Sequence, residues 1–259
     1  MNQILRHLYW DYKIGVIQWK PVLGEKASNL FHLSQWIKTA KDLGADFVLL
    51  PELATTGYVF QNRSHVLALA EENKGESFEF LSHLARKLGI YLIYGYPEKE
   101  GDDLYNSQNL IGCNGEFLGT YRKTHLFFAD RIWARAGNLG YKIFKTDLGK
   151  VSLGICMDMN FQSFIEFHQA NRSDFVAISS YWLNDDCDSF EYWLSRWVNF
   201  GGTVAISNSY GWEGGIEFSG KSCVFQQSQV LGICSKASPQ VLVTSLSKQY
   251  ALQKEGANF

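Results

Sequence analysis

Short apolar runs typical of strands alternate with segments of helical periodicity along most of this chain of 259 residues. The run KIGVIQW (13–19) predicts a strand, and an apolar stripe over 26–43 predicts a helix that stops at Gly44. DFVLL (46–50) predicts a buried strand, which Pro51 should end because proline cannot donate to the sheet ladder. This alternation is typical of α/β folds, in which helices pack on the faces of sheets.

The same alternation continues along the rest of the chain. Further helices are predicted over 76–88, 162–171 and 189–200, and further strands over 90–96, 104–112, 116–121, 150–156, 175–180, 203–208, 222–227 and 230–235. The second half repeats the order of the first, and no linker rich in proline or serine divides them. We therefore predict a single α/β domain over 1–259 with an internal pseudo-repeat, a core of about 13–246, and a polar C-terminal tail at 247–259 that is either mobile or an arm on a partner subunit.

The composition favours a packed protein that acts on small molecules. Hydrophobic residues make up 46% of the chain, and a net charge of −2 gives no reason to expect nucleic acid or an anionic membrane surface as a partner. Near the N-terminus, Arg6, Asp11 and Lys13 interrupt the apolar positions, so this segment resembles neither a signal peptide nor a spanning helix. We expect a soluble cytoplasmic protein with a small-molecule substrate, no nucleic-acid partner and no membrane association.

The spacing of cysteine and histidine does not indicate a metal site. The five cysteines form an odd set without a C-x-x-C pair, which argues against both a disulfide framework and structural zinc. The six histidines are scattered, and neither H-E-x-x-H nor the serine-hydrolase pattern G-x-S-x-G occurs. A functional cysteine in this chain would act as a thiol.

One segment matches a nucleotide-binding motif. GIEFSGKS (215–222) fits the phosphate-loop pattern G-x-x-x-x-G-K-[ST]. That mechanism needs a helix directly after the loop, because the free N–H groups of the helix bind the phosphates. The residues that follow, CVFQQSQVLGI, are rich in strand formers, so a glycine loop that enters a strand is favoured. A phosphate-loop nucleotide binder through Gly215–Ser222 remains the alternative from another functional class.

Three polar side chains follow predicted strands. Cys156 ends VSLGIC, Glu52 follows FVLLP, and Lys123 follows the strand that contains Tyr121. The ends of strands are where α/β folds place reactive groups. Each residue also has an ordinary interpretation, since a buried thiol packs as a small hydrophobe and a lone charge at a strand end is usually solvated. Taken together, the three form a set whose members can compensate one another's burial.

The blocks LLPELATTGY, YRKTHLF and GICMDMNF, in this order, resemble the nitrilase superfamily of carbon–nitrogen hydrolases. The likeness runs from about Lys13 to Leu246 and implies a four-layer αββα sandwich. It also implies that Glu52, Lys123 and Cys156 are the catalytic residues. A catalytically silent binding module of the same fold is the alternative, although all three residues are present.

The resemblance implies covalent catalysis by a thiolate. Glu52 would accept the thiol proton and return it to the leaving amine, since a free cysteine is only slightly ionised at neutral pH. Lys123 and the backbone N–H of Met157 would stabilise the oxyanion, at about 3 to 4 kcal/mol per well-placed donor. Water would then hydrolyse the thioester on Cys156. Such a reaction needs no metal and no organic cofactor, so we expect none.

The substrate contacts implied by the resemblance are less specific. Many family members carry a second glutamate after the lysine block; here the available acid is Asp130, which either takes that role or is a turn residue. The expected pocket residues are Tyr58, Asn160, Phe161, Tyr181 and Trp182, each of which is equally well an ordinary core or rim residue. Aromatic walls with one amide side chain suit a modest, mostly uncharged acyl group.

The resemblance favours a small linear amide, as in omega-amidases, over a nitrile. Nitrile hydrolases of this superfamily typically have tryptophan and glutamate after the cysteine, whereas this chain has Met157 and Asp158. Two alternatives stay open: removal of ammonia from N-terminal Asn or Gln of proteins, and hydrolysis of N-carbamoyl compounds, whose acid group Arg131 or Arg135 would hold. Family members commonly pair, so we expect a homodimer.

Overall fold

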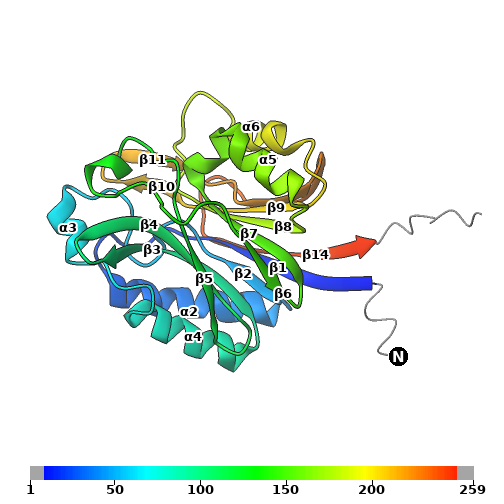
Figure 1. Ribbon diagram of the computed structural model, residues 1–259, viewed down its shortest axis with the longest axis horizontal. Helices are drawn as coiled ribbons and strands as arrows, with labels where there is room; N and C mark the ends of the chain where they lie inside the picture. The colour runs from blue at the N-terminus through cyan, green and yellow to red at the C-terminus, as the bar shows by residue number, and fades with distance from the viewer. Residues whose placement is uncertain (1–8, 250–259) are drawn as a thin grey trace, which may run out of the picture.

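Two six-stranded sheets pack face to face within residues 9–249, the part of the chain that the computed structural model describes. Helices cover the outer face of each sheet, so the layers follow the order helix, sheet, sheet, helix (Figure 1). This architecture confirms the predicted αββα sandwich. Within the described residues, no helix is long and apolar enough to cross a membrane.

The first sheet is built mainly from the N-terminal half of the chain. Its strands lie in the order β14 (Gln240–Gln249), β1 (Tyr9–Gln18), β2 (Phe47–Leu49), β3 (Tyr91–Glu100), β4 (Asp103–Ile111) and β5 (Phe117–Arg122). Strands β1, β2 and β3 are parallel, and the remaining neighbours are antiparallel. Its outer face is covered by α2 (Lys26–Asp42) and α4 (Glu76–Leu88), whose leucines and alanines pack on the sheet.

The second sheet repeats this plan with the C-terminal half. Its strands lie in the order β13 (Gln229–Ile233), β12 (Cys223–Gln226), β9 (Thr203–Asn208), β8 (Phe175–Ser180), β7 (Gly149–Ile155) and β6 (Ile143–Thr146). Strands β7, β8 and β9 are parallel. Helices α5 (Gln162–Ala170) and α6 (Ser189–Trp197) cover its outer face, where Trp193 and Trp197 are fully buried.

Apolar side chains from the two inner faces fill the space between the sheets, among them Ile14, Phe47, Leu153 and Ala177. Hydrogen bonds also cross this space. Ser179 Oγ donates to the carbonyl of Leu50 at 2.7 Å, and Ser207 Oγ donates to the carbonyl of Ile17 at 2.6 Å. The two sheets are therefore joined by polar contacts as well as by apolar burial.

The remaining helices and strands lie in the loops that connect the strands of the two sheets. They are α3 (Arg63–Leu67), the short 3-10 helices η1 (Asp130–Ile132) and η2 (Cys156–Asn160), and a two-stranded ribbon of β10 (Tyr210–Glu213) and β11 (Ile216–Ser219). The sequence pattern did not predict α3, β6, β10, β11 or β14. The helix predicted over 189–200 ends earlier, at Trp197.

The C-terminal boundary differs from the prediction. The expected tail at 247–259 begins inside β14, which pairs with β1 along its whole length from Gln18↔Gln240 to Tyr9↔Gln249. The two strands extend together beyond the body of the sandwich (Figure 1). Residues 250–259 lie outside the described residues.

Candidate active site

Glu52 follows β2 at the carboxyl end of the strand. The segment from Leu50 to Leu53 passes so close to β3 that a Cβ on Gly95 would lie 2.5 Å from the Leu53 nitrogen and 2.8 Å from the Pro51 carbonyl oxygen. Leu53 itself has a φ of 46°. This tight path buries Glu52 completely. Because glycine has no Cβ, Gly95 leaves room for this backbone path, which brings the Glu52 carboxylate into the interior.

Lys123 enters the same interior space from the end of β5. Its backbone N–H donates to the carbonyl of Asn106 at 2.8 Å, and its side chain is fully buried. The ammonium Nζ lies 2.7 Å from Glu52 Oε1 and 2.6 Å from Asp130 Oδ2. A buried ammonium is stable only with such partners, because burial alone disfavours the charged form.

Asp130 joins this cluster from η1. Its Oδ2 also accepts the N–H of Phe127 at 2.9 Å, and its Oδ1 accepts Asn106 Nδ2 at 3.1 Å. The same Asn106 Nδ2 donates to Glu52 Oε1 at 2.7 Å. Asp130 is fully buried at the start of η1, where it takes part in the turn and also contacts Lys123. Asn106 had no signal in the sequence beyond being a polar residue inside a predicted strand.

Cys156 lies on the turn from β7 into η2, with a φ of 40° that is unusual for a residue with a side chain. Asp158 holds this turn. Its Oδ2 accepts the N–H of Ile155 at 3.0 Å and the hydroxyl of Tyr121 at 2.8 Å, and its Oδ1 accepts the N–H of His125 at 2.9 Å. A single carboxylate therefore connects the cysteine turn to the segment on either side of Lys123.

Burial controls the ionisation of the three predicted catalytic residues. It raises the pKa of Cys156 to about 12, with Glu52 adding to the rise and Lys123 opposing it. Burial also raises the pKa of Glu52, against the opposing effect of Lys123. Burial lowers the pKa of Lys123, but Asp130 and Glu52 outweigh it, and the net pKa is raised. These shifts favour the neutral thiol of Cys156 and the charged ammonium of Lys123.

The two carboxylate oxygens of Glu52 differ in their contacts. Its Oε1 takes the hydrogen bonds from Lys123 and Asn106. Its Oε2 is buried and has no hydrogen-bond partner among the described residues. That oxygen is left to accept a proton from a thiol or from water.

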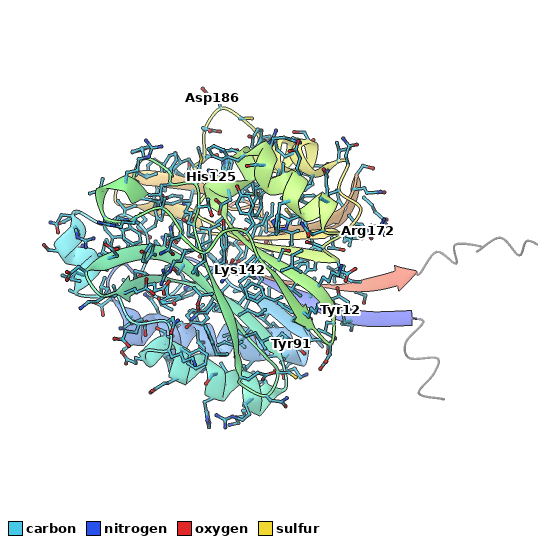
Figure 2. The ribbon with its side chains drawn as sticks, viewed as in Figure 1. Tyr12, Tyr91, His125, Lys142, Arg172 and Asp186 are labelled. Atoms are coloured by element: carbon cyan, nitrogen blue, oxygen red, sulfur yellow. The ribbon has the colours of Figure 1, made fainter. Side chains whose placement is uncertain are left out.

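A cavity of about 200 Å³ opens beside Cys156. Its described lining consists of Phe127, Cys156, Met157, Asn160, Tyr181, Trp182, Leu183 and Asp185. Asn160, Tyr181 and Trp182 are three of the expected pocket residues; Phe127, Leu183 and Asp185 were not expected. A larger depression of about 570 Å³, whose wall includes Tyr12 and Arg172 (Figure 2), contains none of the predicted catalytic side chains.

Two expected pocket residues lie elsewhere. Phe161 is partly exposed, and its ring stacks on that of His125 with centroids 3.5 Å apart. Tyr58 is buried behind the wall, where its ring stacks on Tyr181 at 5.0 Å and lies 5.9 Å from Lys123 Nζ. Phe161 therefore does not reach the cavity, and Tyr58 supports it from behind.

Glu213 is a further buried acid that the sequence did not indicate. It comes from β10, and its Oε1 accepts the backbone N–H groups of Tyr58 and Val59 at 2.7 and 2.6 Å. Its Oε2 accepts the hydroxyl of Tyr181 at 2.9 Å. The two-stranded ribbon thereby holds Tyr181 in the cavity wall and Tyr58 behind it.

The phosphate-loop pattern at 215–222 is not followed by a helix. Ile216–Ser219 forms β11, and Cys223–Gln226 forms β12. Lys221 Nζ pairs with Asp188 Oδ2 at 2.6 Å, and Ser222 Oγ donates to the carbonyl of Asn208 at 3.1 Å. The glycine loop enters a strand as favoured, and the geometry gives no site for a nucleotide phosphate. Among the described residues, no group of His, Cys, Asp and Glu is arranged to hold a metal ion.

The chain is similar to several known proteins. Residues 13–250 match the family model of carbon–nitrogen hydrolases. A nitrilase of Pyrococcus abyssi is 37% identical over 166 residues, which cover 64% of this chain and 63% of that protein. The protein N-terminal amidase of Schizosaccharomyces pombe is 28% identical over 285 residues, covering 91% of this chain and 100% of that protein.

A solved structure is also similar. It is a mutant of the amidase from Nesterenkonia sp. AN1 that shows covalent addition of the acetamide moiety of fluoroacetamide at its active-site cysteine. The two chains superpose with a TM-score of 0.80 at 25% identity, covering 91% of this chain and 90% of that chain.

Proposed function

Because this chain belongs to the carbon–nitrogen hydrolase family, in the amidase-like branch of the nitrilase superfamily, we propose that it hydrolyses a small linear amide and releases ammonia. The observation that carries the proposal is the buried contact of Lys123 with Glu52 at 2.7 Å, beside a cysteine that lines a cavity. The covalent adduct on the cysteine of the Nesterenkonia amidase supports the same role for Cys156.

In the first half of the proposed reaction, Cys156 Sγ attacks the amide carbonyl carbon. Glu52 Oε2 takes the thiol proton as the C–S bond forms and the carbonyl electrons move to oxygen. The ammonium of Lys123 and the N–H of Met157 stabilise that oxyanion. Glu52 then gives its proton to the amide nitrogen, the C–N bond breaks, and ammonia leaves a thioester on Cys156.

The second half regenerates the thiol. Glu52 accepts a proton from water, whose oxygen attacks the thioester carbonyl through a second oxyanion. The C–S bond breaks, the thiolate takes the proton back from Glu52, and the carboxylic acid product leaves. In this scheme Asp130 and Asn106 are positioning residues, since they contact Lys123 and Glu52 rather than the substrate.

The size of the cavity supports a short substrate. About 200 Å³ accommodates a small acyl group, and its aromatic wall suits an acyl chain of a few carbons. The full-length similarity to an N-terminal amidase supports a second candidate, in which the amide belongs to an N-terminal Asn or Gln side chain of a polypeptide.

The location and assembly of the protein are also part of this proposal. All five cysteines are free thiols, which supports a reducing compartment such as the cytoplasm. We propose a homodimer on the basis of the family resemblance alone. Light scattering of the purified protein at micromolar concentration measures its mass directly, and a monomer of 29.5 kDa would contradict the homodimer.

An ammonia-release assay tests the reaction. Primary amides, nitriles, N-carbamoyl compounds and peptides with N-terminal Asn or Gln are compared for the wild type, Cys156→Ala and the matched control Cys187→Ala, which changes an exposed cysteine. We expect ammonia from a primary amide with the wild type and Cys187→Ala, and none with Cys156→Ala. Equal rates for the two variants would contradict the role of Cys156.

A further inference from the structure

The wall of the active-site cavity carries one formal charge besides the catalytic cluster, and this charge is negative. Asp185 is an exposed lining residue of the cavity, whereas the other lining side chains apart from Cys156 are apolar, aromatic or amide groups. None of the described lining residues is a lysine, arginine or histidine. An acyl group that bears a carboxylate would therefore enter the cavity without a cationic partner.

The buried charged groups behind the cavity also include more carboxylates than ammonium groups. Lys123 faces two carboxylates, those of Glu52 and Asp130. Glu213 adds another carboxylate behind Tyr181, 2.9 Å from the tyrosine hydroxyl oxygen. Because carboxylates outnumber ammonium groups in this described cluster, the summed potential in the cavity favours a cation over an anion.

Cationic side chains also lie near Asp185, but outside the cavity. Lys221 and Lys236 line an adjacent surface groove that Asp185 shares; Lys221 pairs with Asp188 at 2.6 Å, whereas Lys236 forms no ion pair with a described residue. Arg131 and Arg135, expected to hold the acid group of a carbamoyl substrate, do not line the cavity. Arg135 instead pairs with Asp103 at 2.7 Å.

We propose that Asp185 selects amides whose acyl group carries an ammonium group close to the scissile bond, and that amides with a carboxylate in that place are poor substrates. The inference rests on the proposed function and names its substrate class. Asp185 Oδ1 accepts the N–H of Cys187 at 3.0 Å, which orients the carboxylate. Its Oδ2 forms no hydrogen bond with the described residues and is left for a ligand.

Three amides with the same chain up to the end group test the effect of charge; the first two are equal in size, and the third has a bulkier end group. They are 3-aminopropionamide, butyramide and succinamate, which end in an ammonium, a methyl and a carboxylate group. Each is assayed for ammonia release with the wild type, Asp185→Asn and Asp186→Asn. Asparagine keeps an oxygen to accept the N–H of Cys187. Asp186, at the tip of the same loop (Figure 2), does not line the cavity and is the matched control.

We expect the wild-type kcat/KM to fall in the order 3-aminopropionamide, butyramide, succinamate. Asp185→Asn should lower the ratio of the first to the second roughly 1.5- to fivefold, which corresponds to the range measured for exposed ion pairs. Asp186→Asn should keep the wild-type ratio. The inference is overturned if Asp185→Asn keeps that ratio while butyramide is hydrolysed, or if succinamate is the best substrate. Failure of the wild type on all three amides would instead remove the proposed function and this inference with it.

Discussion

Replacing Lys123 by methionine should destabilise the protein strongly, because this ammonium separates two buried carboxylates. Its Nζ lies 2.7 Å from Glu52 and 2.6 Å from Asp130, and all three side chains are fully buried. Removing one partner of a buried ion pair costs about 3 to 5 kcal/mol, since the remaining charge loses its compensation. In a chain of this size, that loss lowers the melting temperature by roughly 6 to 20 °C.

The loss of stability should depend on pH, and the direction of this dependence follows from the pKa of Glu52. Burial already raises its pKa, and removal of the lysine raises it further. A carboxyl group with a raised pKa binds its proton in the folded state at a pH where the unfolded chain has lost it. Folding is therefore favoured as the pH falls, so the deficit of Lys123→Met should shrink between pH 8 and pH 5.

Urea denaturation at several pH values, followed by tryptophan fluorescence, measures both effects. Lys145→Met is the control, since Lys145 is exposed on β6 and its loss should leave the free energy of unfolding near the wild-type value. The reasoning is refuted if the two variants are equally stable, or if the deficit of Lys123→Met is the same at pH 5 and pH 8.

Two further predictions concern Glu52. Glu52→Gln keeps an oxygen for the hydrogen bonds from Lys123 and Asn106, so circular dichroism should show an intact fold. Because the base is removed, kcat/KM for an amide should fall about 10²- to 10⁴-fold. Activity within tenfold of the wild type would contradict the role of Glu52. Gly95→Ala should lower the free energy of unfolding by about 1 to 3 kcal/mol in urea denaturation and should also lower kcat, because the new Cβ would lie 2.5 Å from the Leu53 nitrogen. Unchanged stability and rate would show that this close approach of the two segments is unimportant.

The order of helices and strands could be predicted from the sequence because it depends on local patterns. Apolar periodicity located α2 and α4 closely, and the strand ends located Glu52, Lys123 and Cys156. Short or edge elements gave no such signal. Strand β14 is an example: its pairing with β1 joins residues more than 200 positions apart, such as Gln18 and Gln240, and no local period encodes that partner.

The sequence by itself determined the fold class, the two halves and the three residues that end strands, since each depends on side chains that are neighbours along the chain. The tertiary structure decided the environment of those residues. Asn106, Asp130 and Glu213 act through hydrogen bonds to distant segments, and Phe161 turns away from the cavity although it follows the nucleophile closely. A polar residue shows its role only when folding buries it against a partner, because burial without a partner is unfavourable and the partner comes from another strand.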